Sequence, residues 1–166
     1  MKKYIIIIAV LLSLVVISGC INSDMDNINN LIQQLNNNIV NGDLNYNAAV
    51  DDLNSHNYDD AAEKINIANE NFNECKNKIA EIKQSYKKLN NSLYEDYIDL
   101  VGQEIDLKLN ATINLKHALN NFQKGNNQTA NKYVDYANNF MIDGIQIQKE
   151  RDQLVSDNTD KFKTKT

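Results

Sequence analysis

The stretch "AAEKINIANENFNECKNKIAEIKQSYKKL", residues 61–89, has an apolar residue at every third or fourth position. These positions are Ala61, Ile65, Ala68, Phe72, Cys75, Ile79, Ile82, Tyr86 and Leu89. Because an α-helix turns once every 3.6 residues, this alternation of steps places all of these side chains on one face. Such a face packs against neighbouring helices at a shallow angle. The stretch therefore predicts a long helix over residues 58–90, with Asn57 as its N-cap.

Two further helices are predicted downstream. Ser92 and Glu95 form an S-x-x-E capping box, which indicates the start of a helix over 92–124. Gly125 suits the left-handed conformation that follows a helix end, and a last helix is expected over 127–155. The apolar face of the 92–124 helix is predicted to contain Tyr94, Tyr97, Leu100, Val101, Ile105, Leu109, Ile113, Leu119 and Phe122.

The same spacing of apolar residues occurs upstream, over 24–56. Gly42 and Asp43 interrupt it, so the pattern admits a kink or a split of this first segment near Gly42. An alternative architecture is a pair of tetratricopeptide-like repeats, whose helices are about half as long. The uninterrupted pattern over 58–90 argues against that alternative.

The four predicted helices form two similar pairs. When residue numbers are shifted by 122 minus 53, Leu53 aligns with Phe122, and the helix-start residue Ser23 aligns with Ser92. We call this shift the repeat offset. We interpret the alignment as one αα-hairpin that occurs twice. Because the connections are very short, neighbouring helices must be antiparallel. The sequence therefore predicts an all-α, up-down-up-down four-helix bundle over residues 24–156, followed by a disordered tail over 157–166.

The first twenty residues, "MKKYIIIIAVLLSLVVISGC", have the layout of a secretory signal. Two lysines precede a nearly uninterrupted apolar run from Tyr4 to Ile17, and small residues follow. A membrane-spanning helix needs about 20 apolar residues, so this run is short for one. An uncleaved N-terminal anchor remains the alternative, and in both cases the two lysines keep the rest of the chain outside the cytoplasm.

Ile17-Ser18-Gly19-Cys20 resembles the lipobox of prokaryotic membrane lipoproteins, which has an aliphatic residue, two small residues and a cysteine. The resemblance covers these residues and the signal before them. It implies that residues 1–19 are a signal peptide, that Cys20 is lipidated, and that residues 20–23 are a short tether. The implied location is the outer face of the cell membrane, with the lipid on Cys20 as the membrane anchor.

The charge of the chain excludes some partners. Without Lys2 and Lys3 the chain has 15 Lys and Arg against 22 Asp and Glu, a net charge of -7 where the whole sequence has -5. An acidic chain without a basic cluster argues against nucleic acid as a partner. Sequons at Asn90, Asn110 and Asn127 make glycosylation possible, but about as many are expected by chance.

The sequence offers no convincing catalytic, cofactor or metal site. His56 and His117 lack the glutamate three residues earlier that a di-iron bundle requires, so solvated or capping roles are expected. No nucleophile motif or phosphate-binding glycine loop occurs. Cys75 lies on the apolar face of 58–90, where a core position is favoured over a reactive thiol. We therefore expect no enzyme activity, no cofactor and no metal.

The tyrosines leave two interpretations open. Tyr94 with Tyr97, and Tyr133 with Tyr136, could form a contact strip for a partner, but such side chains more often pack at the core edge. The function we expect is a non-catalytic binding or structural role at the cell envelope, with a protein or envelope component as partner. The alternative is a small-ligand sensor or carrier whose site lies between the helices.

Overall fold

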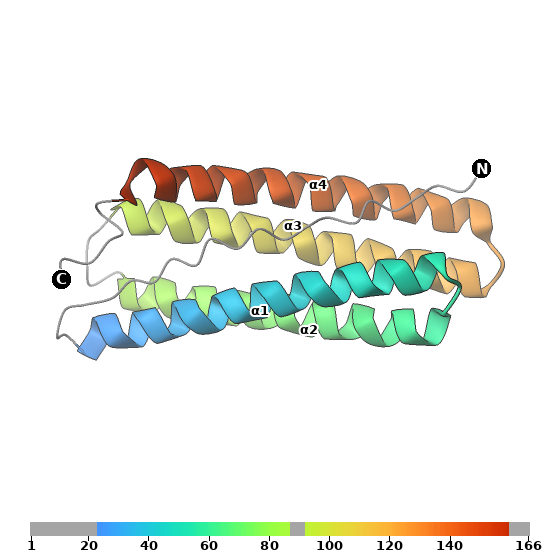
Figure 1. Ribbon diagram of the computed structural model, residues 1–166, viewed down its shortest axis with the longest axis horizontal. Helices are drawn as coiled ribbons and strands as arrows, with labels where there is room; N and C mark the ends of the chain where they lie inside the picture. Colours follow the sequence, from blue (N-terminus) through green and yellow to red (C-terminus); the bar gives the residue numbers. More distant parts are fainter. Residues whose placement is uncertain (1–22, 87–91, 160–166) are drawn as a thin grey trace.

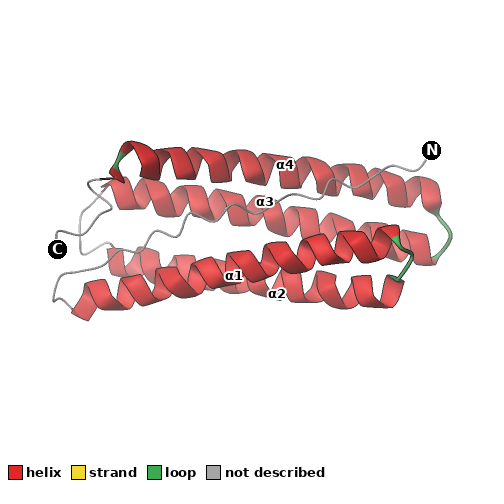
Figure 2. Ribbon diagram, viewed as in Figure 1, coloured by secondary structure: helices red, strands yellow, loops and turns green. Residues whose placement is uncertain are grey.

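The computed structural model describes residues 23–86 and 92–159, and it confirms an all-α four-helix bundle. The helices are α1 (Ser23–Asn54), α2 (Tyr58–Tyr86), α3 (Ser92–Gln123) and α4 (Asn127–Asp157), and the described residues contain no strand (Figure 2). Each helix has 29 to 32 residues, which corresponds to about 45 Å. These lengths exclude the tetratricopeptide-like alternative.

The helices associate as two tight hairpins. α1 packs along α2 and α3 along α4, and the hairpins meet mainly where α2 lies beside α3. The turns within both hairpins lie at one end of the bundle, and α1 begins at the opposite end (Figure 1). Between the described helices α1 and α4, no two Cα atoms come within 8 Å. The two hairpins therefore approach each other closely where α2 faces α3 and lie farther apart where α1 faces α4.

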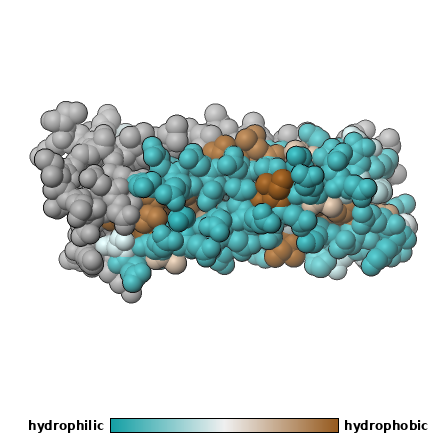
Figure 3. Space-filling view, turned by 90° about the horizontal axis from the view of Figure 1, so that it is seen from below, coloured by the Kyte–Doolittle hydropathy of each residue, from teal (hydrophilic) through white to brown (hydrophobic). Residues whose placement is uncertain are grey.

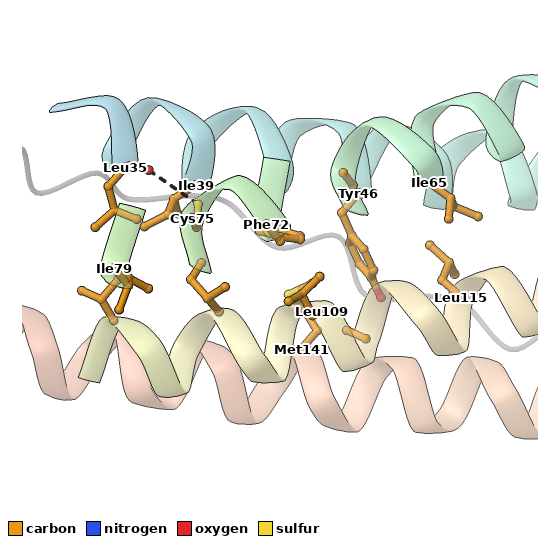
Figure 4. Close-up of a cluster of buried hydrophobic side chains, with 14 of the residues drawn as sticks. Leu35, Ile39, Tyr46, Ile65, Phe72, Cys75, Ile79, Leu109, Leu115 and Met141 are labelled. Carbon is orange, nitrogen blue, oxygen red and sulfur yellow. Dashed lines mark hydrogen bonds between the residues drawn. The ribbon is translucent and has the colours of Figure 1, made fainter. Parts of the chain in front are cut away.

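The core follows the predicted apolar faces. From Ala61 to Ile82 every predicted core residue of α2 is buried, and Phe72 meets Leu109 and Met141 of the other hairpin in the centre of the bundle (Figure 4). The side chains of Tyr86 and Leu89 lie outside the described part. The predicted core residues of α3 that are buried are Tyr94, Tyr97, Val101, Ile105, Leu109 and Leu119, while Leu100 and Phe122 are half-buried.

Ile113 was predicted to face the core, and this prediction is wrong. Its side chain is 44% exposed, while Thr112 and Leu115 are fully buried. Each step of four positions exceeds one full helical turn, so a strict series from Ile105 through Leu109 to Ile113 rotates out of the interface. Leu44, which precedes Ile113 by the repeat offset, is exposed in the same way, at 57%.

The split of the first helix that the sequence admits near Gly42 does not occur, because α1 is continuous from Ser23 to Asn54. Gly42 is buried against Phe72 of α2. A Cβ atom at this position would lie only 2.5 Å from Cε1 of Phe72. The glycine is therefore required by the close approach of the two helices and does not mark a break.

The two hairpin turns have the same hydrogen bonds, which supports the duplication. The Asn57 N–H donates to the Asp52 carbonyl at 2.8 Å, and the Asn126 N–H donates to the Asn121 carbonyl at 2.9 Å. Both donors and both acceptors differ by the repeat offset (126 minus 57, and 121 minus 52). This bond spans the end of a helix in the manner of a Schellman motif.

The residue that carries the left-handed backbone is also at the same place in each turn. It is His56, with φ of 63°, in the first turn and Gly125, with φ of 74°, in the second. Glycine adopts this conformation without steric cost, whereas a side chain at the same φ is disfavoured. The two turns thus share one geometry although their sequences differ.

The surface of the bundle is mostly hydrophilic, with separate apolar spots on the face shown in Figure 3. Over the described ranges, no helix has a segment of the length and hydropathy that membrane crossing requires. The predicted signal peptide, Cys20 and the tail from 160 onward lie outside the described residues.

Candidate functional site

Four charged side chains meet inside the bundle, and we call Asp43, Glu104, Lys108 and Arg151 the core charge cluster. The exposed fraction of each residue is 6% or less. Nζ of Lys108 lies 2.7 Å from Oδ2 of Asp43 and 2.8 Å from Oε1 of Glu104. Nη1 of Arg151 donates to Oε2 of Glu104 at 2.7 Å. The cluster therefore connects α1, α3 and α4 through two adjacent turns of α3.

The local sequence explains why these side chains converge. Glu104 and Lys108 are four residues apart on α3, a spacing that places them one above the other. Gly144 of α4 lies beside the lysine stem, and a Cβ there would make an ordinary van der Waals contact, 3.4 Å from Cγ of Lys108. The buried Thr112 hydroxyl donates a hydrogen bond to the Lys108 carbonyl at 2.8 Å, so this polar group has a partner inside the core. The Lys108 side chain thus links α3 to α1, and the Arg151 side chain links α4 to α3.

Electrostatics keeps the two cations of the cluster charged. Burial by itself lowers the pKa of Lys108, but the carboxylates of Glu104 and Asp43 more than offset this and raise the pKa above its usual value. In the same way, burial lowers the pKa of Arg151, but Glu104, Tyr97 and Asp152 together more than offset this and raise the pKa above its usual value. Burial raises the pKa of Asp43, and Lys108 opposes that shift. Since an ammonium group lies 2.7 Å from Asp43, we assign this carboxyl as the ionised member of an ion pair.

Two buried oxygens in the described part of the chain accept or donate no hydrogen bond. They are the hydroxyl of Tyr46 and Oε1 of Glu104. The glutamate oxygen still has the Lys108 ammonium at 2.8 Å, so its charge is compensated. The Tyr46 hydroxyl has no such partner, and burial raises the pKa of this tyrosine.

The buried groups predict a loss of stability at alkaline pH. The folded pKa values of Cys75, Tyr46, Tyr97 and Lys108 all lie above their ordinary values of 9.0, 10.0, 10.0 and 10.5. A group of this kind contributes stability below its unfolded pKa and loses that contribution as pH rises towards the folded value. The free energy of unfolding should therefore fall steadily above about pH 9, by up to about 1.4 kcal/mol per pH unit for each group.

Urea unfolding at successive pH values measures this loss. Tyr46→Phe should reduce the alkaline slope, because it removes one of the groups, whereas Tyr136→Phe at an exposed position should leave the slope unchanged. A stability that stays constant to pH 11 would contradict the prediction.

The histidines and cysteine named from the sequence do not join the cluster. His56 and His117 are exposed, and the histidine rings contact Tyr58 and Tyr133, at centroid distances of 5.9 and 5.1 Å. Cys75 is fully buried, and its thiol donates to the Leu35 carbonyl at 3.7 Å (Figure 4). The core position predicted for Cys75 is thus confirmed. Within 23–86 and 92–159 there is no group of three residues that could ligate a metal.

The tyrosine pairs differ in their environments. Tyr94 and Tyr97 are buried, so they belong to the core and not to a contact strip. Tyr136 is 53% exposed and makes an edge contact with Tyr133, at 6.2 Å between ring centroids. Tyr133 in turn contacts His117, so these three residues form an aromatic group near the hairpin turns. We call it the α4 aromatic group.

The core charge cluster was missed from the sequence, although signals for it exist. Arg151 is the only arginine in the whole sequence. Asp43 and Lys108 fall on helix faces whose neighbours three and four residues away, such as Ile39 and Thr112, are buried. A charge on an apolar face combined with a rare arginine indicates a buried ion pair, because arginine is favoured for such pairs.

No protein-family model, curated protein or solved structure matches this chain. The arrangement itself must therefore indicate what the chain can do. The ionic groups of the cluster pair in a chain from Asp43 through Lys108 and Glu104 to Arg151, and Arg151 also pairs with the half-buried Asp152. These pairs join three helices, which is a supporting role.

Proposed function

We propose that this chain is a lipid-anchored, non-catalytic helical protein at the outer face of a prokaryotic membrane, with a binding or structural role. The resemblance of Ile17-Ser18-Gly19-Cys20 to a lipobox supports the anchor, and the core charge cluster supports the non-catalytic, structural role. Its two cations and two carboxylates are buried and paired across α1, α3 and α4. Groups engaged in this way stabilise a unique packing of the helices and are not exposed to a substrate.

The orientation of the bundle supports a role in presenting a surface. α1 begins at Ser23, close after the proposed lipidation site, whereas both hairpin turns lie at the far end (Figure 1). A bundle of this length would hold its turns about 45 Å from the tethered end. The α4 aromatic group lies near those turns, and aromatic side chains are enriched where proteins bind each other. We propose this group as the partner contact, with a protein or another envelope component as the partner.

The lipid anchor can be tested with two matched cysteine variants in a prokaryotic host. Cys20→Ala should abolish labelling by a radioactive fatty acid and leave the precursor uncleaved, since the acceptor thiol is gone. Cys75→Ala should keep both labelling and cleavage, because this thiol is buried in the core. Labelling that persists in Cys20→Ala would refute the anchor, and a specific hydrolase activity of the purified protein would refute the non-catalytic role.

The alternative function, a small-ligand site between the helices, draws on the Tyr46 hydroxyl. This buried group has no hydrogen-bond partner in the described chain, and a polar ligand could supply one. A ligand that binds only the folded protein raises its melting temperature. Thermal-shift measurements with metal ions and metabolites therefore separate the two functions.

A further inference from the structure

The two hairpins of the bundle are repeats, but their buried charges are not. Shifting each member of the core charge cluster by the repeat offset gives the equivalent residue in the other hairpin. Each charge then meets an uncharged buried residue. Glu104 corresponds to Leu35, Lys108 to Ile39, Arg151 to Ile82 and Asp43 to Thr112.

This asymmetry gives the hairpins different needs for a counter-charge. The first hairpin contributes the Asp43 carboxylate, which pairs with Lys108 of the other hairpin. Within the second hairpin, Lys108 pairs with Glu104, and Arg151 pairs with Glu104 and with the half-buried Asp152. Asp43 therefore gains its cation only when a first hairpin packs against a second.

Pairing of like hairpins would leave buried charges uncompensated. Two first hairpins would bring together two Asp43 carboxylates without the Lys108 ammonium, and two second hairpins would leave each Lys108 without its Asp43 partner. An unpaired charge in a protein core is strongly unfavourable. The apolar faces alone would not discriminate, because the two hairpins share the same spacing of core residues and the same turn geometry.

We propose that the core charge cluster selects the pairing of unlike hairpins and so prevents association of this chain with a second copy through like hairpins. Buried polar groups are known to specify helix partners in this way, at some expense of stability. The selection matters most where copies are concentrated and share one orientation, as tethered copies on a membrane would be. It applies equally to untethered copies, so it does not depend on the proposed function.

The test uses a full-length chain in which the cluster is made equivalent between hairpins. Asp43→Thr, Glu104→Leu, Lys108→Ile and Arg151→Ile give each position the residue of the other hairpin. Spin labels are attached at Leu44→Cys in a Cys20→Ala background, in detergent. Because Leu44 and Ile113 are equivalent and exposed, a doubly labelled parent (Leu44→Cys, Ile113→Cys) supplies the reference distance. In a dimer of like first hairpins, two labels at position 44 should lie at that same distance.

The expected result is an intermolecular distance equal to the reference in the four-residue variant and none in the singly labelled parent. A matched control neutralises two exposed ion pairs, Lys76–Asp106 and Lys83–Asp99, and should show no intermolecular distance. If the four-residue variant does not fold, the milder variant Asp43→Asn takes its place in the test, because it removes the buried charge of the first hairpin. It should show the same intermolecular distance in a smaller fraction of the molecules. A folded variant without this distance, or a parent that shows it, would overturn the proposal.

Discussion

Lys108→Met should reduce the free energy of unfolding by about 3–5 kcal/mol, a large fraction of what a domain of this size possesses. The substitution removes the ammonium group that lies between Asp43 and Glu104, each within 2.8 Å. Arg151 still pairs with Glu104, but Asp43 becomes a buried carboxylate without a cation. Urea unfolding followed by circular dichroism measures the effect.

Lys76→Met is the matched control for this substitution. Lys76 forms an ion pair of the same length, 2.7 Å, with Asp106, but both side chains are more than half exposed. Exposed pairs contribute about 0–1 kcal/mol, so this variant should remain close to the parent. Equal losses in the two variants would mean that burial of the core charge cluster does not determine its energy.

Gly42→Ala should destabilise the bundle by about 1–3 kcal/mol, although alanine is the better helix former. The new Cβ would lie 2.5 Å from the Phe72 ring, and Phe72 is fully buried, so the ring has no free space to enter. α1 and α2 would have to separate. Thermal unfolding should show the loss as a lower melting temperature.

Gly102→Ala should have the opposite sign. Gly102 also lies within a helix, but a Cβ there meets nothing within 4 Å. Gly102→Ala should therefore raise the free energy of unfolding by the full gain in helix propensity, about 0.5–1 kcal/mol.

Replacing the opposing ring by a smaller side chain, with Phe72→Leu, should restore part of the stability lost in Gly42→Ala, and a double-mutant cycle should show this coupling. Independent effects of the two substitutions would contradict the steric explanation.

The fold could be predicted from the sequence because its signals are local and repeated. The three- and four-residue spacing from Ala61 to Ile82 identifies a long amphipathic helix by itself. Gly125 marks a turn, and the repeat offset locates the equivalent turn at His56. The described helix boundaries lie within a few positions of those predicted, since short connections leave little freedom.

The core charge cluster depends on side chains from three helices, so no single segment indicates it. Lys108 has the composition of a surface position, and only its neighbours on the same face show that it is buried. The sequence left the role of Gly42 open for a related reason, since a glycine that ends a helix and one that admits a neighbouring ring look alike in sequence. The exposure of Ile113 did have a signal in the sequence, since two successive steps of four residues turn a side chain out of the interface.

The coincident turn bonds have a historical consequence. If the bundle arose by fusion of two identical hairpins, the ancestor was a symmetric homodimer in which every core residue occurred twice. Asp43 now stands where the other half has Thr112, and Lys108 where it has Ile39. Each of these differences arose after the genes were joined, when the two halves could first mutate independently.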